Sequence, residues 1–255
     1  MPPMKNLPAK RSAAIPRTAP VGGPRQRRKR TEPPLNRDTV VAAALEEIDR
    51  AGLEAFSLRN VAKRLGVYPA SITWHAASRS QLLADVVTMA LADVRPPGFH
   101  DTWQSYLRQT FHRFRNAIRR HPNIAPLIGT QLVANSTLAL DFIEGLLAAL
   151  HHARFSGTRL VAAYNAVIAA VVGFTTQEFA PMPSEDTGAW QRGIRERLAG
   201  VQRTRYPLLA DNMKLLGNKA FTVRWQNGTE APLDASFDSF IDIVIAGLER
   251  FASGG

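Results

Sequence analysis

Two short helical patterns joined by a tight turn that begins with a glycine restrict the fold of this chain more than any other feature. Ser57 suits the N-cap of the first pattern, residues 58–65, and Gly66 ends it because glycine readily adopts the left-handed conformation of a helix C-terminus. Pro69 begins the second pattern, where proline is tolerated because an amide in the first turn has no intrahelical partner. The segment therefore predicts two short helices joined by a tight turn, the second running to about Ala76.

Longer helical patterns flank this pair. Asn36 is a good N-cap, and apolar residues recur after it at helical spacing until Ala51. Apolar residues over 82–91 predict a further amphipathic helix, which we expect to close near residues 96–98, Pro-Pro-Gly, at a domain boundary. This organisation is that of a helix-turn-helix, in which the exposed N-terminal end of the third helix enters the major groove of DNA.

The remainder of the chain keeps the helical period. Residues 180–188 are typical of a loop, and the helix expected over residues 190–201 is mostly polar. Only residues 221–233 suggest strands, with Asn227-Gly228 as a hairpin turn. The expected fold class is therefore all-α, with this hairpin as a local exception. Apolar stripes at helical spacing are formed by Trp103, Leu107, Phe111, Phe114 and Ile118, by Leu138, Phe142, Leu146 and Leu150, and by Phe237, Phe240, Ile241, Val244, Leu248 and Phe251.

Positive charge is concentrated at the N-terminus. The net charge is +11, and up to Arg37 ten lysines or arginines face one acidic residue, whereas the rest of the chain carries 22 bases against 20 acids. Residues 1–34 are also rich in proline and poor in large apolar groups, which predicts a disordered basic arm. The run RQRRKR, residues 25–30, is typical of an arm that follows phosphates or enters a minor groove, and equally of a solubilising tail.

Composition excludes several classes of protein. No cysteine is present, so disulfides, thiolate chemistry and cysteine-based metal sites are excluded. Prolines and charges interrupt every apolar run near the N-terminus, which argues against a signal peptide, and the same prolines argue against a transit peptide. The most apolar segment, residues 160–174, contains Asn165 and is shorter than the roughly 20 residues that span a bilayer. We therefore expect a cytoplasmic protein without a membrane partner.

The run GLEAFSLRNVAKRLGVYPASITWHAASRSQLL, residues 52–83, resembles the DNA-binding domain of the TetR family of bacterial transcriptional regulators, and especially its tetracycline-repressor branch. The similarity continues through WQSYLRQTF, residues 103–111, and together with the final helix it extends over roughly residues 36–251. The basic arm lies outside it. The positions at family spacing are Gly52, Leu53, Arg59, Ala62, Leu65, Gly66, Val67, Trp74, His75, Arg79, Leu82 and Leu83.

The resemblance implies a role for each matching residue. Arg59 matches a family arginine that reaches a base edge, and its guanidinium suits a bidentate contact to guanine. Residues 68–71 match the base-reading turn, while Trp74, His75 and Arg79 match residues that grip the phosphate backbone. Tyr68 and Thr73 depart from the family pattern, so the operator sequence is not transferred from a relative. The candidate DNA-binding residues are Arg59, Tyr68, Pro69, Ala70, Ser71, Thr73, Trp74, His75 and Arg79.

The resemblance also implies three parts: the arm over residues 1–34, a helix-turn-helix domain over 35–95, and a helical domain over 96–255 that binds an effector and forms a homodimer. The helices over residues 160–179 and 237–251 are the expected dimer contacts, because both are too apolar to stay exposed on a monomer. The candidate effector-pocket residues are Trp103, Phe111, His112, Phe114, Ile118, Asn165, Phe174 and Gln177. Most such residues belong to a core more often than to a pocket.

No metal or cofactor is expected. Tetracycline repressors bind a drug-chelated magnesium through a histidine, but the corresponding stretch, residues 126–132, has no histidine, and Ile128 is nearest the aligned place. The histidines form no pair at i, i+4, and His151 and His152 point to different faces of a helix. The resemblance to the tetracycline-repressor branch therefore does not extend to this ligand.

The sequence favours a DNA-binding transcriptional regulator, a repressor that leaves an inverted-repeat operator when a small effector binds. Two alternatives stay open. A basic-tailed nucleic-acid-binding protein would use charge alone and ignore base sequence. A small helical enzyme would use His75, or His112 with Asp101 or Glu144, for acid-base chemistry, but no nucleophile elbow, phosphate loop or metal motif supports it.

Overall fold

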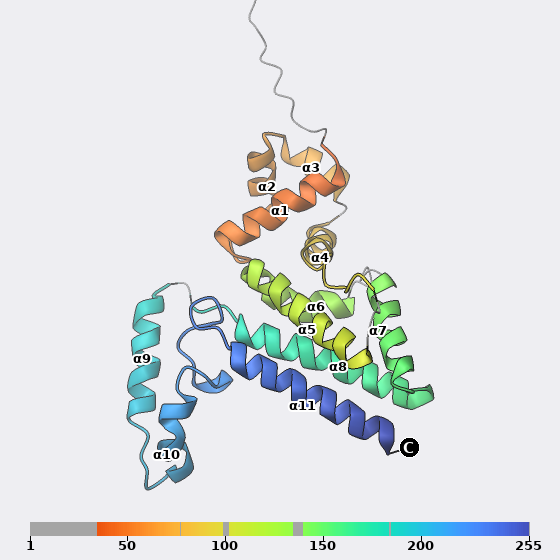
Figure 1. Cartoon of the computed structure of the whole chain (residues 1–255). Coiled ribbons are helices and arrows are strands. Elements are labelled where there is room, and N and C mark those ends of the chain that lie inside the picture. Colours follow the sequence, from red (N-terminus) through yellow and green to blue (C-terminus); the bar gives the residue numbers. More distant parts are fainter. Residues whose placement is uncertain (1–34, 77, 99–101, 135–139, 184, 255) are drawn as a thin grey trace, which may run out of the picture. The chain divides into compact units, whose positions relative to one another are not determined.

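The structure, a computed structural model, describes residues 35–254 apart from 77, 99–101, 135–139 and 184; of residues 130–134 it describes the backbone alone (Figure 1). The predicted basic arm, residues 1–34, and Asp101 lie outside the described residues. Within the described part every regular element is a helix, so the predicted all-α fold class is confirmed.

α1 (Arg37–Ala51) begins at the N-cap that the sequence predicts. The Asn36 carboxamide oxygen accepts a hydrogen bond from the Thr39 backbone N–H at 2.8 Å, and the Thr39 hydroxyl accepts one from the Asn36 N–H at 2.9 Å. Gly52 follows the helix with a φ of 79°, which a residue with a Cβ rarely adopts. Both ends of α1 are thus set by residues visible in the sequence.

α2 (Leu58–Leu65) and α3 (Pro69–His75) form the predicted pair of short helices. The Ser57 hydroxyl accepts a hydrogen bond from a first-turn amide of α2, and Gly66 ends that helix with a φ of 67°. Because Gly66 is left-handed, the next amide, of Val67, turns back and donates to a carbonyl of α2 at 3.0 Å. The tight turn of the helix-turn-helix is therefore present.

α4 (Arg79–Ala90) packs on α1 and closes a small core with α3, in which Ile48, Ile72 and Leu82 are fully buried. The helix ends at Ala90, earlier than the prolines at residues 96–97 that the sequence suggested as its end. Residues 91–98, which we call the linker, begin with hydrogen-bonded turns instead.

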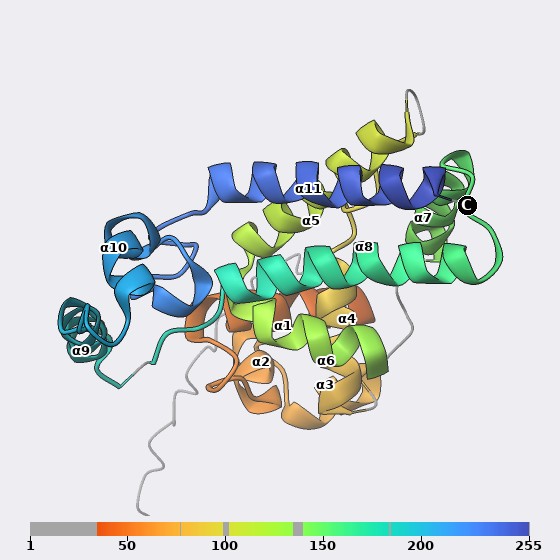
Figure 2. The same ribbon diagram turned by 90° about the horizontal axis from the view of Figure 1, so that it is seen from below.

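Five of the remaining helices, α5, α6, α7, α8 and α11, form a larger helical layer, and α9 and α10 lie to one side of it (Figure 2). α8 and α11 run antiparallel, and α5 packs on both of them as well as on α7. Their bounds are α5 (Trp103–Arg120), η1 (Pro122–Ile124), α6 (Ala125–Ala134), α7 (Leu140–His152), α8 (Gly157–Glu178), α9 (Thr187–Ala199), α10 (Pro207–Leu216), η2 (Phe221–Val223) and α11 (Asp234–Ser253).

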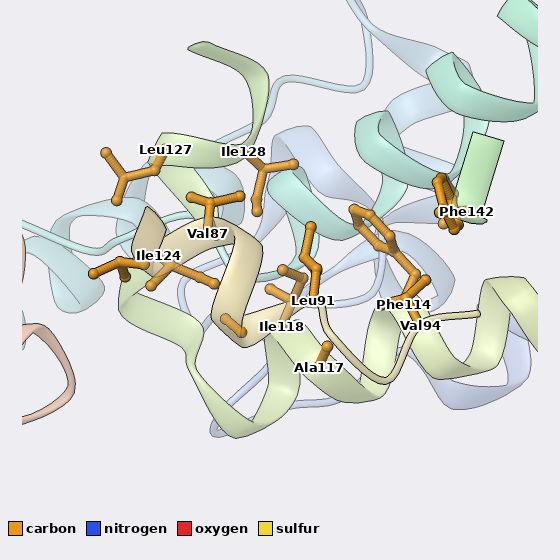
Figure 3. Packing of buried hydrophobic residues seen from close by; sticks show 14 of the residues in the cluster. Val87, Leu91, Val94, Phe114, Ala117, Ile118, Ile124, Leu127, Ile128 and Phe142 are labelled. Atoms are coloured by element: carbon orange, nitrogen blue, oxygen red, sulfur yellow. The ribbon is translucent and has the colours of Figure 1, made fainter. Parts of the chain in front are cut away.

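One hydrophobic core connects α4 to this larger layer. Figure 3 shows Val87 of α4 and Leu91 of the linker packed among Ile118 of α5, Ile124 of η1 and Ile128 of α6. All five side chains are buried. A shift of α5 or α6 therefore cannot occur without a response from α4, since close-packed side chains transmit displacement.

A buried ion pair joins the far end of the layer. The Arg115 guanidinium of α5 donates to the Glu178 carboxylate of α8 through Nε at 2.7 Å and Nη2 at 2.6 Å, and both side chains are at most 5% exposed. Nη1 donates to Asp234 at 2.7 Å, at the start of α11. This network fixes the ends of three helices relative to one another.

The predicted hairpin over residues 221–233 is wrong. This segment contains η2 followed by loop, because its backbone amides find side-chain and loop partners instead of a second strand. The Asn218 carboxamide oxygen accepts from the amides of Trp225 and Gln226, and the Gly228 amide donates to the Glu178 carbonyl at 2.6 Å. A Cβ at Gly228 would lie 2.6 Å from a Glu178 carbon, so glycine is required for close approach here and not for a hairpin turn.

Two features of the helices differ from the sequence analysis. α10 was not anticipated, and neither α9 nor α10 contains a buried residue. α8 is longer than the apolar segment delimited from the sequence: at 22 residues it has the length and composition of a membrane span, as no other helix of the described residues has. It is nevertheless paired through Glu178 with α5 and packed against α6, α7 and α11.

Candidate DNA-binding surface and effector cavity

α3 presents its N-terminal end to solvent. Ile72 anchors the helix in the core, while Pro69 and Ala70 are exposed and Ser71 is half-buried. Tyr68 precedes the helix, makes no side-chain cap hydrogen bond and is 84% exposed. The four predicted base-reading residues, 68–71, thus lie together at one exposed helix end, as entry into a major groove requires.

Trp74 is 87% exposed. A core role for this indole is excluded, because a core tryptophan would be buried. Thr73 is also exposed and donates its hydroxyl proton to the Ala70 carbonyl at 2.8 Å. His75, at the last turn of α3, is half-buried.

The basic residues around α3 fall into two groups. Arg64 is held by Glu46 at 2.5 Å and Arg37 by Asp85 at 2.7 Å, so their charges are neutralised within the fold. Arg59 forms no ion pair with any described residue and is exposed on α2. The Arg79 guanidinium lies 5.5 Å from the ring centre of Phe56, which holds it beside the start of α4. Arg59 and Arg79 are therefore available to a polyanion.

A cavity of about 550 Å³ lies in the larger helical layer. Its volume falls within the range of sites that hold small organic molecules. Helices α4, α5, α7 and α8 and the linker all contribute walls. The lining residues are Thr88, Leu91, Ala92, Val94, Arg95, Pro96, Pro97, Phe114, Asp141, Phe142, Tyr164, Ile168 and Val172.

Polar groups are few in this cavity. Arg95 of the linker and Asp141 of α7 approach to 3.8 Å, which is an ion pair but too long for a hydrogen bond. Thr88 donates to the Ala84 carbonyl within α4 at 3.0 Å. Burial raises the pKa of Tyr164, so its hydroxyl stays a neutral donor at physiological pH.

Of the eight predicted pocket residues, Phe114 alone lines this cavity. Ile118 lies in the core with α4, and Phe111 and Phe174 both contact the ring of Phe240 of α11. The other four lie as follows: Trp103 is half-buried at the start of α5, His112 packs against Phe237 and lies 3.6 Å from Asp238, and Asn165 and Gln177 are exposed on α8.

The cavity residues that sequence reasoning missed are mainly on α8 and the linker. Tyr164, Ile168 and Val172 recur every four residues and form one face of α8. Because α8 is apolar around most of its circumference, nothing in the sequence separates this face from the core face.

The described residues contain no group of three or more metal-binding side chains. Ile128, at the position where tetracycline repressors use a histidine, is completely buried. Acid-base chemistry by His112 with Glu144 has no geometric support, since the carboxylate beside His112 is Asp238.

An exposed reading helix on a helix-turn-helix, with a separate ligand-sized cavity, defines a DNA-binding regulator of transcription. Comparison with known families agrees. Residues 40–86 match the family described as bacterial regulatory proteins, tetR family, and residues 96–251 match the tetracyclin repressor-like C-terminal domain. The chain belongs to the tetR family of bacterial transcriptional regulators, as the sequence resemblance predicted.

Individual relatives cover most of the chain. An HTH-type transcriptional regulator of Saccharopolyspora erythraea is 29% identical over 231 residues, which span 89% of this chain and 90% of the relative. The fold is similar to that of Streptomyces coelicolor ActR in complex with (S)-DNPA, with a TM-score of 0.64, 21% identity and coverage of 86% and 99% of the two chains. It is also similar to BioQ with its double-stranded DNA operator, with a TM-score of 0.53, 24% identity and coverage of 71% and 99%.

Proposed function

We propose that this protein is a ligand-responsive repressor, which binds an inverted-repeat DNA operator as a homodimer and leaves it when a small molecule occupies the cavity. One observation carries the proposal: α4 packs on α1, the helix that in turn contacts α2 and α3, while the last turn of α4 and the linker form a wall of the cavity. A ligand in the cavity thus touches the segment that positions the reading helix.

The mechanism is a shift between two conformations. A ligand that binds best when α4 and the linker are displaced favours that conformation by its difference in affinity for the two. In a dimer the displacement changes the separation of the two α3 helices. Because the half-sites lie about one DNA turn apart, a changed separation weakens operator binding.

Exposed apolar surface supports the dimer. The face of α8 away from the core carries Val161, Ala162, Ala166 and Ala169, all exposed, and α11 exposes Ile243 at 71%. Small residues allow two helices to approach closely, and the apolar face of a monomer is stabilised by burial. The antiparallel pair α8 and α11 therefore supplies half of a four-helix bundle, with a second copy supplying the rest.

Roles and boundaries follow from this proposal. Residues 35–95 form the DNA-binding domain and 96–255 the effector and dimerisation domain. Arg59 and residues 68–71 read bases, and the phosphate contacts come from Trp74, His75 and Arg79. The contribution of the arm, residues 1–34, to phosphate binding stays a prediction.

The proposal includes a cytoplasmic location, no membrane partner and no catalytic activity. The effector is a free organic molecule and not a magnesium chelate of tetracycline, since Ile128 offers no ligand atom. The complexes of ActR with (S)-DNPA and of BioQ with its operator support ligand and operator binding as activities of this fold.

Selection of bound DNA from a random duplex pool tests the proposal. We expect a two-fold symmetric consensus, bound at least about a thousandfold more tightly than unrelated duplexes. Binding by charge alone, the second candidate function, gives no consensus. Recovery of no consensus at physiological salt would overturn the operator proposal.

A further inference from the structure

The chemistry of the cavity narrows the class of ligand, an inference that rests on the proposed function. Most of its wall is carbon, from side chains such as Leu91, Phe114, Phe142, Ile168 and Val172. A molecule that fills it must be largely apolar, and the two phenylalanines and Tyr164 suit a ring system.

Two charged side chains of the cavity wall, Arg95 and Asp141, differ in their exposure to solvent. The Arg95 side chain is 49% exposed, whereas the Asp141 side chain is 79% exposed. Water therefore screens the carboxylate more than the guanidinium, and at 3.8 Å the two groups form no hydrogen bond. Arg95 consequently contributes positive potential to the cavity and has donors that Asp141 does not satisfy.

Arg95 has further neighbours at a second cavity. It also lines a smaller cavity of about 120 Å³ with Tyr106, Glu144 and Gly145. A Cβ at Gly145 would lie 2.0 Å from the Tyr106 hydroxyl oxygen, so the glycine is what admits the Tyr106 side chain beside Arg95. Burial raises the pKa of Tyr106, against the opposite effect of the neighbouring Arg95, so the Tyr106 hydroxyl is neutral at physiological pH. The acidic neighbours of Arg95, Asp141 and Glu144, are both exposed.

We infer that the effector is an apolar, ring-bearing organic anion whose acidic group binds the Arg95 guanidinium at the mouth of the cavity. The anion replaces the long Arg95–Asp141 pair with charge-assisted hydrogen bonds, for which a planar guanidinium is well suited. The neutral hydroxyl of Tyr164 provides a further donor in the same cavity. Because Arg95 belongs to the linker, binding of the anion pulls directly on the segment that follows α4.

Two fluorescent probes that differ in one acidic group test this inference on the full chain. 1-Anilinonaphthalene-8-sulfonate carries a sulfonate, and N-phenyl-1-naphthylamine is the same ring system without it. We expect the sulfonate probe to bind more tightly, and Arg95→Gln to weaken it by at least about tenfold while leaving the neutral probe unchanged. Asp141→Asn should bind the sulfonate probe at least as tightly as the parent chain.

Arg120→Gln is the matched control. Arg120 pairs with Asp93 at the same 3.8 Å and with similar exposure, but it does not line the cavity. This variant should bind both probes as the parent chain does. Ile168→Trp places an indole in the cavity and should weaken binding of both probes, which assigns the signal to this site. Circular dichroism of each variant confirms that it is folded.

Three results would overturn the inference: equal affinity of the parent chain for the two probes, equal loss of affinity for the sulfonate probe in Arg95→Gln and Arg120→Gln, or unchanged probe affinity in Ile168→Trp. The proposed function fails in a different way. A protein that selects no symmetric operator is not a repressor, whether or not Arg95 binds an anion.

Discussion

His121 Nδ1 lies 2.8 Å from Oδ2 of Asp49, and this contact joins the end of α5 to the last turn of α1. Two residues later, the Asn123 carboxamide donates to the carbonyls of Ile48 at 2.9 Å and Asp49 at 3.1 Å. The Ile48 carbonyl already accepts from the Gly52 amide at 2.8 Å, so Asn123 adds a second hydrogen bond to it. Carbonyls in the last turn of a helix lack an intrahelical partner, and Asn123 supplies one to the Asp49 carbonyl. The DNA-binding helices are thus held to the larger layer by polar contacts at α1 as well as by the core around α4.

Replacing Asn123 should weaken the contact between α1 and the larger helical layer. We expect Asn123→Ala to lower the free energy of unfolding by about 1–2 kcal/mol, because the partly buried Asp49 carbonyl loses its donor and the Ile48 carbonyl loses one of two. Urea denaturation followed by circular dichroism measures the loss. Asn116→Ala, at an exposed position of α5, is the control and should change stability by less than about 0.5 kcal/mol. Equal effects of the two variants would show that the Asn123 hydrogen bonds add nothing.

The buried pair Arg115–Glu178 should be sensitive to loss of one partner. Arg115→Met leaves the Glu178 carboxylate buried beside an apolar chain, and we expect a cost of about 3–5 kcal/mol in the free energy of unfolding. Arg119→Met is the control, since Arg119 pairs with the same Asp234 from an exposed position and should cost at most about 1 kcal/mol. Similar urea midpoints for both variants would contradict the role given to the buried pair.

Asp234 makes stability depend on acid pH. Arg119 and Arg115 lower the pKa of this carboxyl, against the opposite effect of burial. A lowered folded-state pKa means that the ionised group adds stability above its ordinary pKa of 3.8, and that this stability is lost as pH falls through the folded-state value. In urea denaturation between pH 7 and pH 2, Asp234→Asn should therefore be less stable than the parent at neutral pH and should converge with it at the acid end. If the free energies of unfolding of Asp234→Asn and the parent differed by the same amount at every pH in this range, ionisation of Asp234 would not contribute to stability.

Elements whose ends are set by contacts between residues close in sequence could be predicted, whereas those set by tertiary contacts could not. Asn36, Ser57 and Gly66 act on backbone groups within a few residues, so α1, α2 and the turn before α3 could be delimited from the sequence. The false hairpin shows the opposite case. Asn227-Gly228 has the composition of a hairpin turn, but the Gly228 amide binds a carbonyl of α8, a contact that depends on the tertiary fold.

The effector cavity could not be predicted for a related reason. A cavity depends on how several helices are placed relative to one another. The pattern of apolar residues along one helix contains no information on that placement. Phe114 was anticipated from its stripe, whereas Phe111, one turn earlier on α5, belongs to the core. No sequence pattern singled out Arg95 as a pocket residue, because its place in the cavity depends on the tertiary fold, which brings the linker close to Asp141 of α7.

Arg59 and Trp74 should affect operator binding in different ways. If Arg59 reads a guanine, Arg59→Ala should cost about 1–3 kcal/mol and relax the preference at one base pair in each half-site. Trp74→Ala should weaken binding to all sequences alike, because a phosphate contact carries no sequence information. Binding to a set of single-base operator variants separates the two. Arg64→Ala is the control for Arg59, since Arg64 is already paired with Glu46. A uniform loss in Arg59→Ala would make Arg59 a phosphate contact instead.

The exposed face of α8 should be essential for the dimer. Ala166 is exposed on this face, and a glutamate there would be buried at the interface between two copies without a partner. We expect Ala166→Glu to be a folded monomer at micromolar concentration, where the parent chain is a dimer, with operator affinity reduced at least about a hundredfold because each half-site is then bound alone. Analytical ultracentrifugation measures the mass. Ala55→Glu, exposed in the loop before α2, is the matched control and should stay dimeric. A dimeric Ala166→Glu variant would move the interface away from α8.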